Sequence, residues 1–148
     1  MNKSSLEALL KRINEMENKS IITIMTPLSN MIFIDENDSR EEMLKKIERS
    51  KRTFYPVCNQ GAENVVGIIH IKDLLIGALK NSEIDIKEGL HEPVYFTETN
   101  SILHVYNIFY QSNIGAAFVV NKLNNVIGFI TLTDVTKTLL GNLFVNKG

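Results

Sequence analysis

The sequence lacks the residues and runs that are typical of several large classes of proteins. Its 148 residues contain one cysteine, no tryptophan and three prolines, and 16 basic residues nearly balance 17 acidic ones. The single cysteine, Cys58, excludes an internal disulfide framework, and the three scattered histidines lack the spacing of zinc ligands. A net charge of −1 is atypical of proteins that neutralise nucleic-acid phosphates, so we expect no nucleic-acid partner. Apolar runs such as Leu74–Leu79 are far shorter than the about 20 residues of a membrane-spanning helix.

The overall composition is that of a folded globular domain. Hydrophobic residues make up 44% and charged residues 22% of the chain. A chain of this length can bury roughly 68–70% of its unfolded surface, which is enough for one substantial core. The N-terminus has no signal-peptide pattern. We therefore expect a cytoplasmic domain, or the cytosolic part of a membrane-associated protein.

The chain contains one sequence unit twice. A shift of 61 residues places the segment Tyr55–Leu75 on the segment Ala116–Thr136. Both segments have an apolar run, a glycine, a second apolar run and an aspartate in the same order, which is hard to obtain by chance. The matched positions are Val65 with Val126, Gly67 with Gly128 and Asp73 with Asp134.

Each repeat predicts the order strand, helix, strand, strand, helix. The segments predicted for the first repeat are Met31–Ile34, Arg40–Lys51, Phe54–Asn59, Val65–His70 and about Lys72–Lys80. Those predicted for the second are Val94–Phe96, a helix through Ile102, Val105, Tyr106 and Phe109, then Ala116–Val120, Val126–Thr131 and about Thr133–Phe144. Asp38 and Asn100 are the predicted N-caps of the first helix of each repeat.

An amphipathic helix is predicted ahead of both repeats. Its apolar stripe follows the N-cap candidate Ser4, and we expect it to pack against the repeats; a helix that binds a partner or a membrane is the alternative. The stripe comprises Leu6, Leu9, Leu10, Ile13 and Met16. The predicted organisation is an N-terminal linker helix (1–20), a first repeat (21–80), a connector (81–89) and a second repeat (90–148). The fold class is α/β (α+β), with two βαββα repeats packed with pseudo-twofold symmetry.

Signatures of catalysis are absent, so we expect no enzyme. The sequence has no nucleophile elbow, no H-E-x-x-H motif and no phosphate-binding glycine-rich loop. Cys58 lies in a predicted strand, where a buried inert thiol is expected. His70 and Asp73 stand three apart, but no nucleophile or metal ligand accompanies them, so a hydrolase is the least favoured hypothesis.

The repeated motif ends a strand and begins a helix, and this geometry suits a nucleotide. Free backbone N–H groups at a helix start favour anions. In the second repeat the hydroxyl of Thr131 could donate to a phosphate, and the carboxylate of Asp134 could accept from two ribose hydroxyls. The alternative is that Thr131, Thr133 and Asp134 only cap the helix.

The pattern Gly-apolar-apolar-[Thr/Ser]-x-x-Asp on a repeated βαββα unit resembles a pair of CBS domains, the Bateman module. The resemblance covers nearly everything from Ile24 to Leu143. Three segments are similar to the CBS pair of CorC/hemolysin-C-type proteins, which are associated with magnesium and cobalt efflux and related to the cyclin M transporters. These segments are IMTPLSNMIFID (Ile24–Asp35), NVVGIIHIKDLL (Asn64–Leu75) and GFITLTDVTKTLLG (Gly128–Gly141).

The resemblance implies an adenine nucleotide bound between the two repeats. It assigns ribose binding to Asp134, phosphate contact to Thr131 and an apolar slot for adenine beside Tyr55 and Pro56. The full set implied for the better-equipped cleft is Thr26, Thr53, Phe54, Tyr55, Pro56, Thr131 and Asp134. A second, weaker cleft would use His70, which replaces the family's hydroxyl, with Asp73, Pro93 and Ala116.

Two departures from the family pattern bear on the ligand. Phe54 stands where the family often has an arginine that meets a polyphosphate, unless Arg52 substitutes for it. Thr133 replaces an acidic residue that is usual before the final aspartate. The missing arginine favours AMP over ATP. The missing acidic residue leaves a dependence on Mg²⁺ an open question, and we predict no metal ligands.

The resemblance predicts a regulatory module that binds AMP or ATP and controls a magnesium/cobalt efflux-type transport protein. The partners implied are a second copy of the chain in a homodimer and a membrane transport domain or protein. Family members usually carry a transmembrane region before the pair or a small domain after it, so an excised piece or a short relative is expected. The alternative function is a structural dimerisation module with decayed nucleotide sites.

Overall fold

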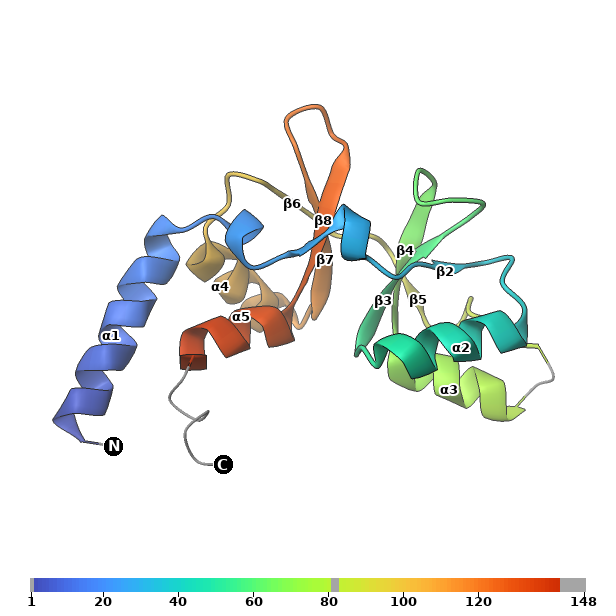
Figure 1. Cartoon of the computed structure of the whole chain (residues 1–148), viewed down its shortest axis with the longest axis horizontal. Coiled ribbons are helices and arrows are strands. Elements are labelled where there is room, and N and C mark those ends of the chain that lie inside the picture. The colour runs from blue at the N-terminus through green and yellow to red at the C-terminus, as the bar shows by residue number, and fades with distance from the viewer. Residues whose placement is uncertain (1, 81–82, 142–148) are drawn as a thin grey trace. The chain divides into compact units, whose positions relative to one another are not determined.

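The structure is a computed structural model that describes residues 2–80 and 83–141. Its packing divides the chain into two compact units, coloured along the chain in Figure 1. One unit is Ser29–Val94, and the other combines Met1–Leu28 with Tyr95–Gly148, as far as these are described. Each unit contains most of one repeat and one mixed four-stranded sheet, which confirms the predicted α/β class.

The unit Ser29–Val94 has the strand order β2-β3-β4-β5. Its elements are β2 (Ile34–Asp35), α2 (Arg40–Ser50), β3 (Phe54–Cys58), β4 (Val65–His70), α3 (Ile71–Lys80) and β5 (Leu90–His91). Strand β2 runs parallel to β3, and the other pairs are antiparallel. Met43 of α2 and Leu74 of α3 pack with Tyr55, Val57 and Ile69 in one buried cluster, so both helices cover the same face of the sheet (Figure 1).

The other unit has the strand order β1-β8-β7-β6. Its elements are α1 (Lys3–Asn18), a 3₁₀ turn (Ile21–Thr23), β1 (Thr26–Pro27), β6 (Tyr95–Thr97), α4 (Ile102–Ser112), β7 (Ala116–Val120), β8 (Val126–Thr131) and α5 (Leu132–Leu140). A further 3₁₀ turn, Leu28–Asn30, follows β1. Strand β7 is buried along its whole length, and α1 contacts α4 and α5, as expected for a helix that packs on the repeats.

An edge strand of each sheet comes from outside its repeat. Strand β1 lies near the start of the first repeat but pairs with β8 of the second, with Thr26 opposite Phe129. Strand β5 lies at the start of the second repeat but pairs with β4 of the first, with His91 opposite Ile68. The limits of the compact units consequently differ from the predicted boundaries, which are 1–20, 21–80, 81–89 and 90–148. Those boundaries describe the repeat in the sequence and stay a prediction.

The repeated glycines are explained by these edge strands. A Cβ atom on Gly67 would collide with the backbone oxygen of His91 in β5. A Cβ atom on Gly128 would lie 2.8 Å from the backbone oxygen of Thr26 in β1 and against the sulfur of Met25. The motif glycine is therefore required because the edge strand crosses directly over it, and backbone atoms cannot yield as a flexible side chain can.

The helix starts differ from the predicted ones by one or two residues. Asn2, Ser39 and Ser101 are the N-caps of α1, α2 and α4, so the predictions of Ser4, Asp38 and Asn100 were wrong. The physical reason lies in the preceding loops. Asp38 accepts a hydrogen bond from the backbone N–H of Asp35, and Asn100 accepts one from that of Thr97, so both close a turn instead. Helix α5 ends at Leu140, and positions 142–144 of the predicted helix lie outside the described residues.

The packing of β5 against Gly67 predicts that Gly67→Ala destabilises the protein by about 1–3 kcal/mol, the usual range for forcing atoms into a filled space. Gly77→Ala in α3 is the matched control. There the added carbon would meet the Cγ2 methyl group of Ile84 at 3.1 Å, and helix propensity improves by up to about 1 kcal/mol. Urea denaturation of both variants measures the difference, and equal stabilities would contradict the explanation.

Candidate nucleotide-binding residues

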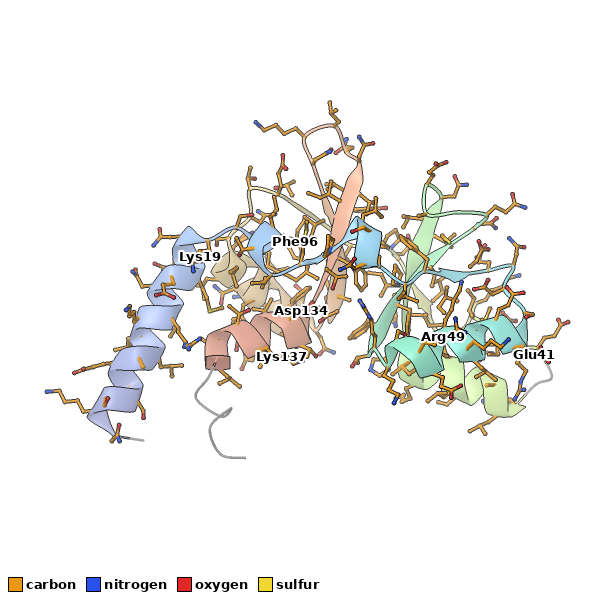
Figure 2. The ribbon with its side chains drawn as sticks, viewed as in Figure 1. Lys19, Glu41, Arg49, Phe96, Asp134 and Lys137 are labelled. Carbon is orange, nitrogen blue, oxygen red and sulfur yellow. The ribbon has the colours of Figure 1, made fainter. Side chains whose placement is uncertain are left out.

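Thr131 and Asp134 are joined at the junction of β8 and α5. The backbone N–H of Asp134 donates to Thr131 Oγ1 at 3.2 Å, and the backbone N–H of Thr131 donates to Asp134 Oδ2 at 2.9 Å. This reciprocal pair is a capping box, in which each side chain satisfies a backbone donor at the helix start. Figure 2 labels Asp134 on α5. The helix-capping role, which the sequence offered as the alternative to ligand binding, is thus present in the structure.

The capping box leaves both side chains with unused hydrogen-bonding groups. Within the described residues, the hydroxyl proton of Thr131 and Asp134 Oδ1 have no hydrogen-bond partner. Both residues are half-buried, so each remains reachable from solvent. A hydroxyl donates one hydrogen bond and a carboxylate accepts several. The pair can therefore cap α5 and contact a ligand at the same time.

The corresponding junction of β4 and α3 is built differently. His70 Nδ1 accepts a hydrogen bond from the backbone N–H of Lys72 at 2.9 Å, so the imidazole does the capping work of the missing hydroxyl. The His70 ring also meets the Phe54 ring edge-on, with centroids 4.9 Å apart. In the described part of the chain the Asp73 side chain makes no hydrogen bond, and its carboxyl group lies against Gly89. The two repeats therefore differ at the junction where ligand contacts were predicted.

The predicted residues at the start of β3 are mostly turned into the fold. Tyr55 has an exposed fraction of 0%, and its ring belongs to the core cluster of its unit. Its hydroxyl pairs with Ser50 Oγ at 2.7 Å and accepts from the backbone N–H of Arg52 at 3.1 Å. Pro56 is buried, Phe54 is half-buried and Thr53 is exposed. A ligand beside β3 can thus reach Thr53 and Phe54, whereas the ring of Tyr55 supports the strand from behind.

The remaining predicted residues fall in both units. Thr26 is half-buried in β1, beside the strand that leads to Thr131 and Asp134, so these three belong to one unit. Ala116 is buried opposite Thr131 in the β7–β8 ladder. Pro93, with His70, Asp73 and the residues from Thr53 to Pro56, belongs to the other unit. The assembly of each predicted set into one cleft stays a prediction.

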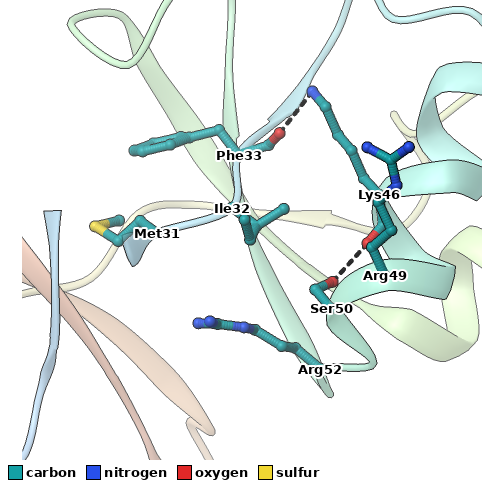
Figure 3. Close-up of a pocket in the computed structure, with 7 residues that line it drawn as sticks. All are labelled: Met31, Ile32, Phe33, Lys46, Arg49, Ser50 and Arg52. Carbon is teal, nitrogen blue, oxygen red and sulfur yellow. Dashed lines mark hydrogen bonds between the residues drawn. The ribbon is translucent and has the colours of Figure 1, made fainter. Parts of the chain in front are cut away.

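A cavity of about 630 Å³ in the unit Ser29–Val94 was not predicted from the sequence. Figure 3 shows its lining, which combines a stretch of chain before β2 with the C-terminal part of α2 and the residue pair after it. The lining residues are Met31, Ile32, Phe33, Lys46, Arg49, Ser50 and Arg52. The sequence feature that could have indicated it is the spacing K-x-x-R-x-x-R of Lys46, Arg49 and Arg52, across the end of the predicted helix.

The thiol of Cys58 is not part of a reactive site. Its exposed fraction is 3%, and burial raises the pKa of the thiol above its usual range. The Asp35 carboxylate, 3.7 Å from the sulfur, raises the pKa further. Among the described residues no three His, Cys, Asp or Glu side chains are grouped as metal ligands. The described helices include none of sufficient length and apolarity to span a membrane.

The burial of Cys58 predicts slow labelling by a thiol reagent such as Ellman's reagent in the native protein near neutral pH. Only the thiolate reacts, and a raised pKa lowers its fraction while burial blocks access. Full labelling is expected at once in urea, which serves as the control. Labelling at the same rate with and without urea would contradict this assignment.

The capping box predicts that Thr131→Ala lowers the stability of the ligand-free protein by about 1 kcal/mol, since a backbone donor at the start of α5 loses its acceptor. Thr133→Ala is the control, because Thr133 is exposed in the first turn of the same helix. Urea denaturation without nucleotide is the measurement. A loss no larger than that of the control would show that the box contributes nothing.

Relatives of known sequence cover almost the whole chain. The UPF0053 protein YegH of Escherichia coli K12 is 31% identical over 91% of this chain and 26% of its own length. Hemolysin C of Brachyspira hyodysenteriae is 26% identical over 87% of this chain and 47% of its own length. The chain therefore spans less than half of either relative.

Solved structures share the fold. A CBS domain from Clostridium difficile 630 is 29% identical, with a TM-score of 0.80 over 86% of this chain and 98% of that one. The CBS domain of a bacterial CNNM/CorC family Mg²⁺ transporter in complex with ATP has a TM-score of 0.81 at 23% identity, over 91% and 96%. A CBS-domain pair with bound AMP from Klebsiella pneumoniae has a TM-score of 0.70 at 15% identity, over 82% and 98%.

The CBS domain family matches the chain twice, over residues 19–79 and 85–141. These two matches contain both glycine–aspartate motifs and both edge strands of the structure. They confirm the resemblance stated from the sequence, including its hemolysin-C-like character. The chain belongs to the CBS domain family, as a tandem pair of CBS domains.

Proposed function

We propose that this CBS pair is a regulatory module that binds an adenine nucleotide and has no catalytic activity of its own. The observation that carries the proposal is the pair Thr131 and Asp134, whose capping box leaves one hydroxyl proton and one carboxylate oxygen free at the start of α5. The start of a helix favours an anion, because its backbone N–H groups carry partial positive charge. ATP and AMP are bound by the two structurally similar CBS proteins named above, which supports the ligand class.

In the proposed complex Asp134 accepts hydrogen bonds from the ribose hydroxyls, and Thr131 donates to the phosphate. Thr26, opposite Phe129 in the same unit, contributes a second hydroxyl. Thr53 and Phe54 form the accessible side that faces adenine, and the buried Tyr55 and Pro56 support this side from behind. The second cleft, with His70, Asp73, Pro93 and Ala116, binds more weakly, since the imidazole already serves α3.

AMP is the proposed ligand in preference to ATP. Phe54 brings no charge to the place where a longer phosphate chain would need an arginine, and its ring is packed against His70. Thr133 is exposed and uncharged, so it adds no carboxylate for a metal-bound polyphosphate. Binding of AMP therefore needs no Mg²⁺ in this proposal.

The regulated protein is proposed to be a membrane transport protein, either joined to this pair or associated with it, with the module on the cytoplasmic side as a homodimer. Support comes from the relatives, which are longer than this chain, and from the CNNM/CorC family transporter whose CBS domain has the same fold. Nucleotide binding can shift the equilibrium between two states of such a protein only by the difference in its affinity for those states, typically about 1–3 kcal/mol.

A structural dimerisation module is the second candidate. The packing of Phe54 on His70 favours it, because an aromatic pair closes a place where the family has polar groups. A thermal melt distinguishes the two functions, since a ligand that binds only the folded protein raises the melting temperature. A melt unchanged by saturating AMP, with a stable dimer in light scattering, would favour the structural role.

The nucleotide proposal predicts that calorimetric titration detects AMP binding, and that Asp134→Ala weakens it about tenfold or more, the usual cost of a lost hydrogen bond to a charged group. Asp73→Ala removes the matching carboxylate of the first repeat and should change the affinity far less. Titrations with ADP and ATP, with and without Mg²⁺, complete the series.

Urea denaturation of both variants shows whether loss of the capping box has unfolded Asp134→Ala. Asp134→Asn, which keeps an acceptor for the backbone N–H of Thr131, replaces it in that case. The absence of binding at millimolar AMP, ADP and ATP would refute the proposed function. A larger effect of Asp73→Ala would move the principal site to the other junction.

A further inference from the structure

Helix α5 carries the proposed nucleotide-binding pair at its start and is contacted by α1 at its end. It has nine residues, and a helix of this length is marginal in water unless contacts fix its ends. The capping box fixes the start. Helices α1 and α5 belong to the same compact unit and contact each other (Figure 1). The stability of α5 therefore depends on what α1 supplies at the other end.

Arg12 of α1 makes the contact at the end of α5. Its side chain is half-buried, and its Nη1 group donates to the backbone oxygen of Thr138 at 3.3 Å. This oxygen is one of the last carbonyl oxygens of α5, which a helix leaves without a partner of its own. A cation near these carbonyl groups is also favoured by the helix dipole. Arg12 therefore acts as a cap for α5 that another helix supplies.

Gly141 allows the guanidinium group to approach this closely. A Cβ atom at position 141 would overlap with the guanidinium group of Arg12. The φ angle of Gly141, +49°, lies in the left-handed region that favours glycine. Its backbone N–H donates to the backbone oxygen of Lys137, which closes the last turn of α5. Gly141 thus ends the helix and leaves room for Arg12.

Hydrogen bonds connect Arg12 with the proposed nucleotide-binding pair. Thr138, whose backbone oxygen accepts from Arg12, donates its own hydroxyl to the backbone oxygen of Asp134 at 2.9 Å. The carboxylate of Asp134 in turn accepts from the backbone N–H of Thr131. Because helix formation is cooperative, the loss of a contact at one end of so short a helix also loosens the other end.

The chain that leaves α1 provides a second connection. The backbone N–H of Ile102 donates to the backbone oxygen of Lys19 at 2.9 Å, and that of Ile21 donates to the backbone oxygen of Asn100 at 3.0 Å. These bonds fix the end of α1 at the start of α4. Strand β1, which holds the proposed ligand residue Thr26, follows directly. Helix α1 is therefore connected with the proposed site both through β1 and through α5.

We infer that Arg12 is a positioning residue for the nucleotide site. It holds α5, and with it the capping box of Thr131 and Asp134, in the arrangement that contacts the ligand. The inference rests on the proposed function, and Arg12 does not itself contact the nucleotide. Coupling between two sites is reciprocal, so a nucleotide that holds the start of α5 also strengthens the attachment of α1.

Hydrogen exchange of the ligand-free full chain, followed by NMR, tests the positioning role. Arg12→Gln should speed exchange along α5 about fivefold or more, back to the amides of Asp134 and Thr131, because a hydrogen bond from a charged donor is lost. Lys11→Gln is the matched control, since it removes the same charge from an exposed neighbouring position of α1. Arg12→Lys keeps a cation and a donor, so it should restore part of the protection.

Two comparisons make this exchange experiment specific. Amides of β3, in the other compact unit, should exchange as in the unmodified protein, which separates local loosening of α5 from a general loss of stability. Equal exchange in Arg12→Gln and Lys11→Gln would overturn the inference. Faster exchange confined to α1 would overturn it as well, because the start of α5 would then not depend on Arg12.

Titration of the same variants with AMP measures the consequence for binding. Arg12→Gln should weaken AMP binding about threefold or more, the usual scale for a residue that couples two sites, and Lys11→Gln should not. AMP should slow exchange in α1 of the unmodified protein, and less so in Arg12→Gln. Equal affinity of Arg12→Gln and the unmodified protein would overturn the inference. If the unmodified protein binds no nucleotide, the proposed function fails, and the exchange data still decide whether Arg12 positions the capping box.

Discussion

The contact between a glycine and an edge strand that crosses it is the constraint on which both sheets depend. Strand β1 lies against Gly128 and β5 against Gly67, so close that no Cβ atom fits beneath either of them. Both edge strands have only two residues, and alone they have too few hydrogen bonds to hold their place. At glycine no side chain separates the two backbones, and this close packing holds the edge strand where the short ladder has too few hydrogen bonds.

This arrangement also determines which functional groups meet. Strand β1 brings Thr26 to the sheet that leads into Thr131 and Asp134, although more than 100 residues separate them in the sequence. In the first repeat the equivalent approach is made by β5 and the preceding Gly89, which lies against Asp73. The exchange of edge strands therefore gives each junction of strand and helix a neighbour from the other part of the chain.

The β4–α3 and β8–α5 junctions differ in their side chains, although both have the same structural role. Each must satisfy backbone donors at the start of a helix. The second repeat does this with Thr131 and Asp134 and retains spare polar groups. The first does it with His70, whose ring is also held by Phe54. Since capping is fulfilled in both, the difference between them concerns what else each junction can bind.

The repeat, the order strand, helix, strand, strand, helix within each copy, and the motif residues Gly67, Asp73, Gly128 and Asp134 were determined by the sequence alone, because they follow from local periodicity and from self-similarity. The family was indicated by the resemblance of these motifs to CBS domains. The strands β1 and β5 could not be predicted, since two-residue strands exist only through their distant partners. The same holds for the burial of the Tyr55 ring and for the cavity beside α2, which join residues brought together by packing. Only the tertiary structure decided that Gly67 and Gly128 are needed for close approach, because the atoms that exclude a Cβ belong to strands from elsewhere in the chain.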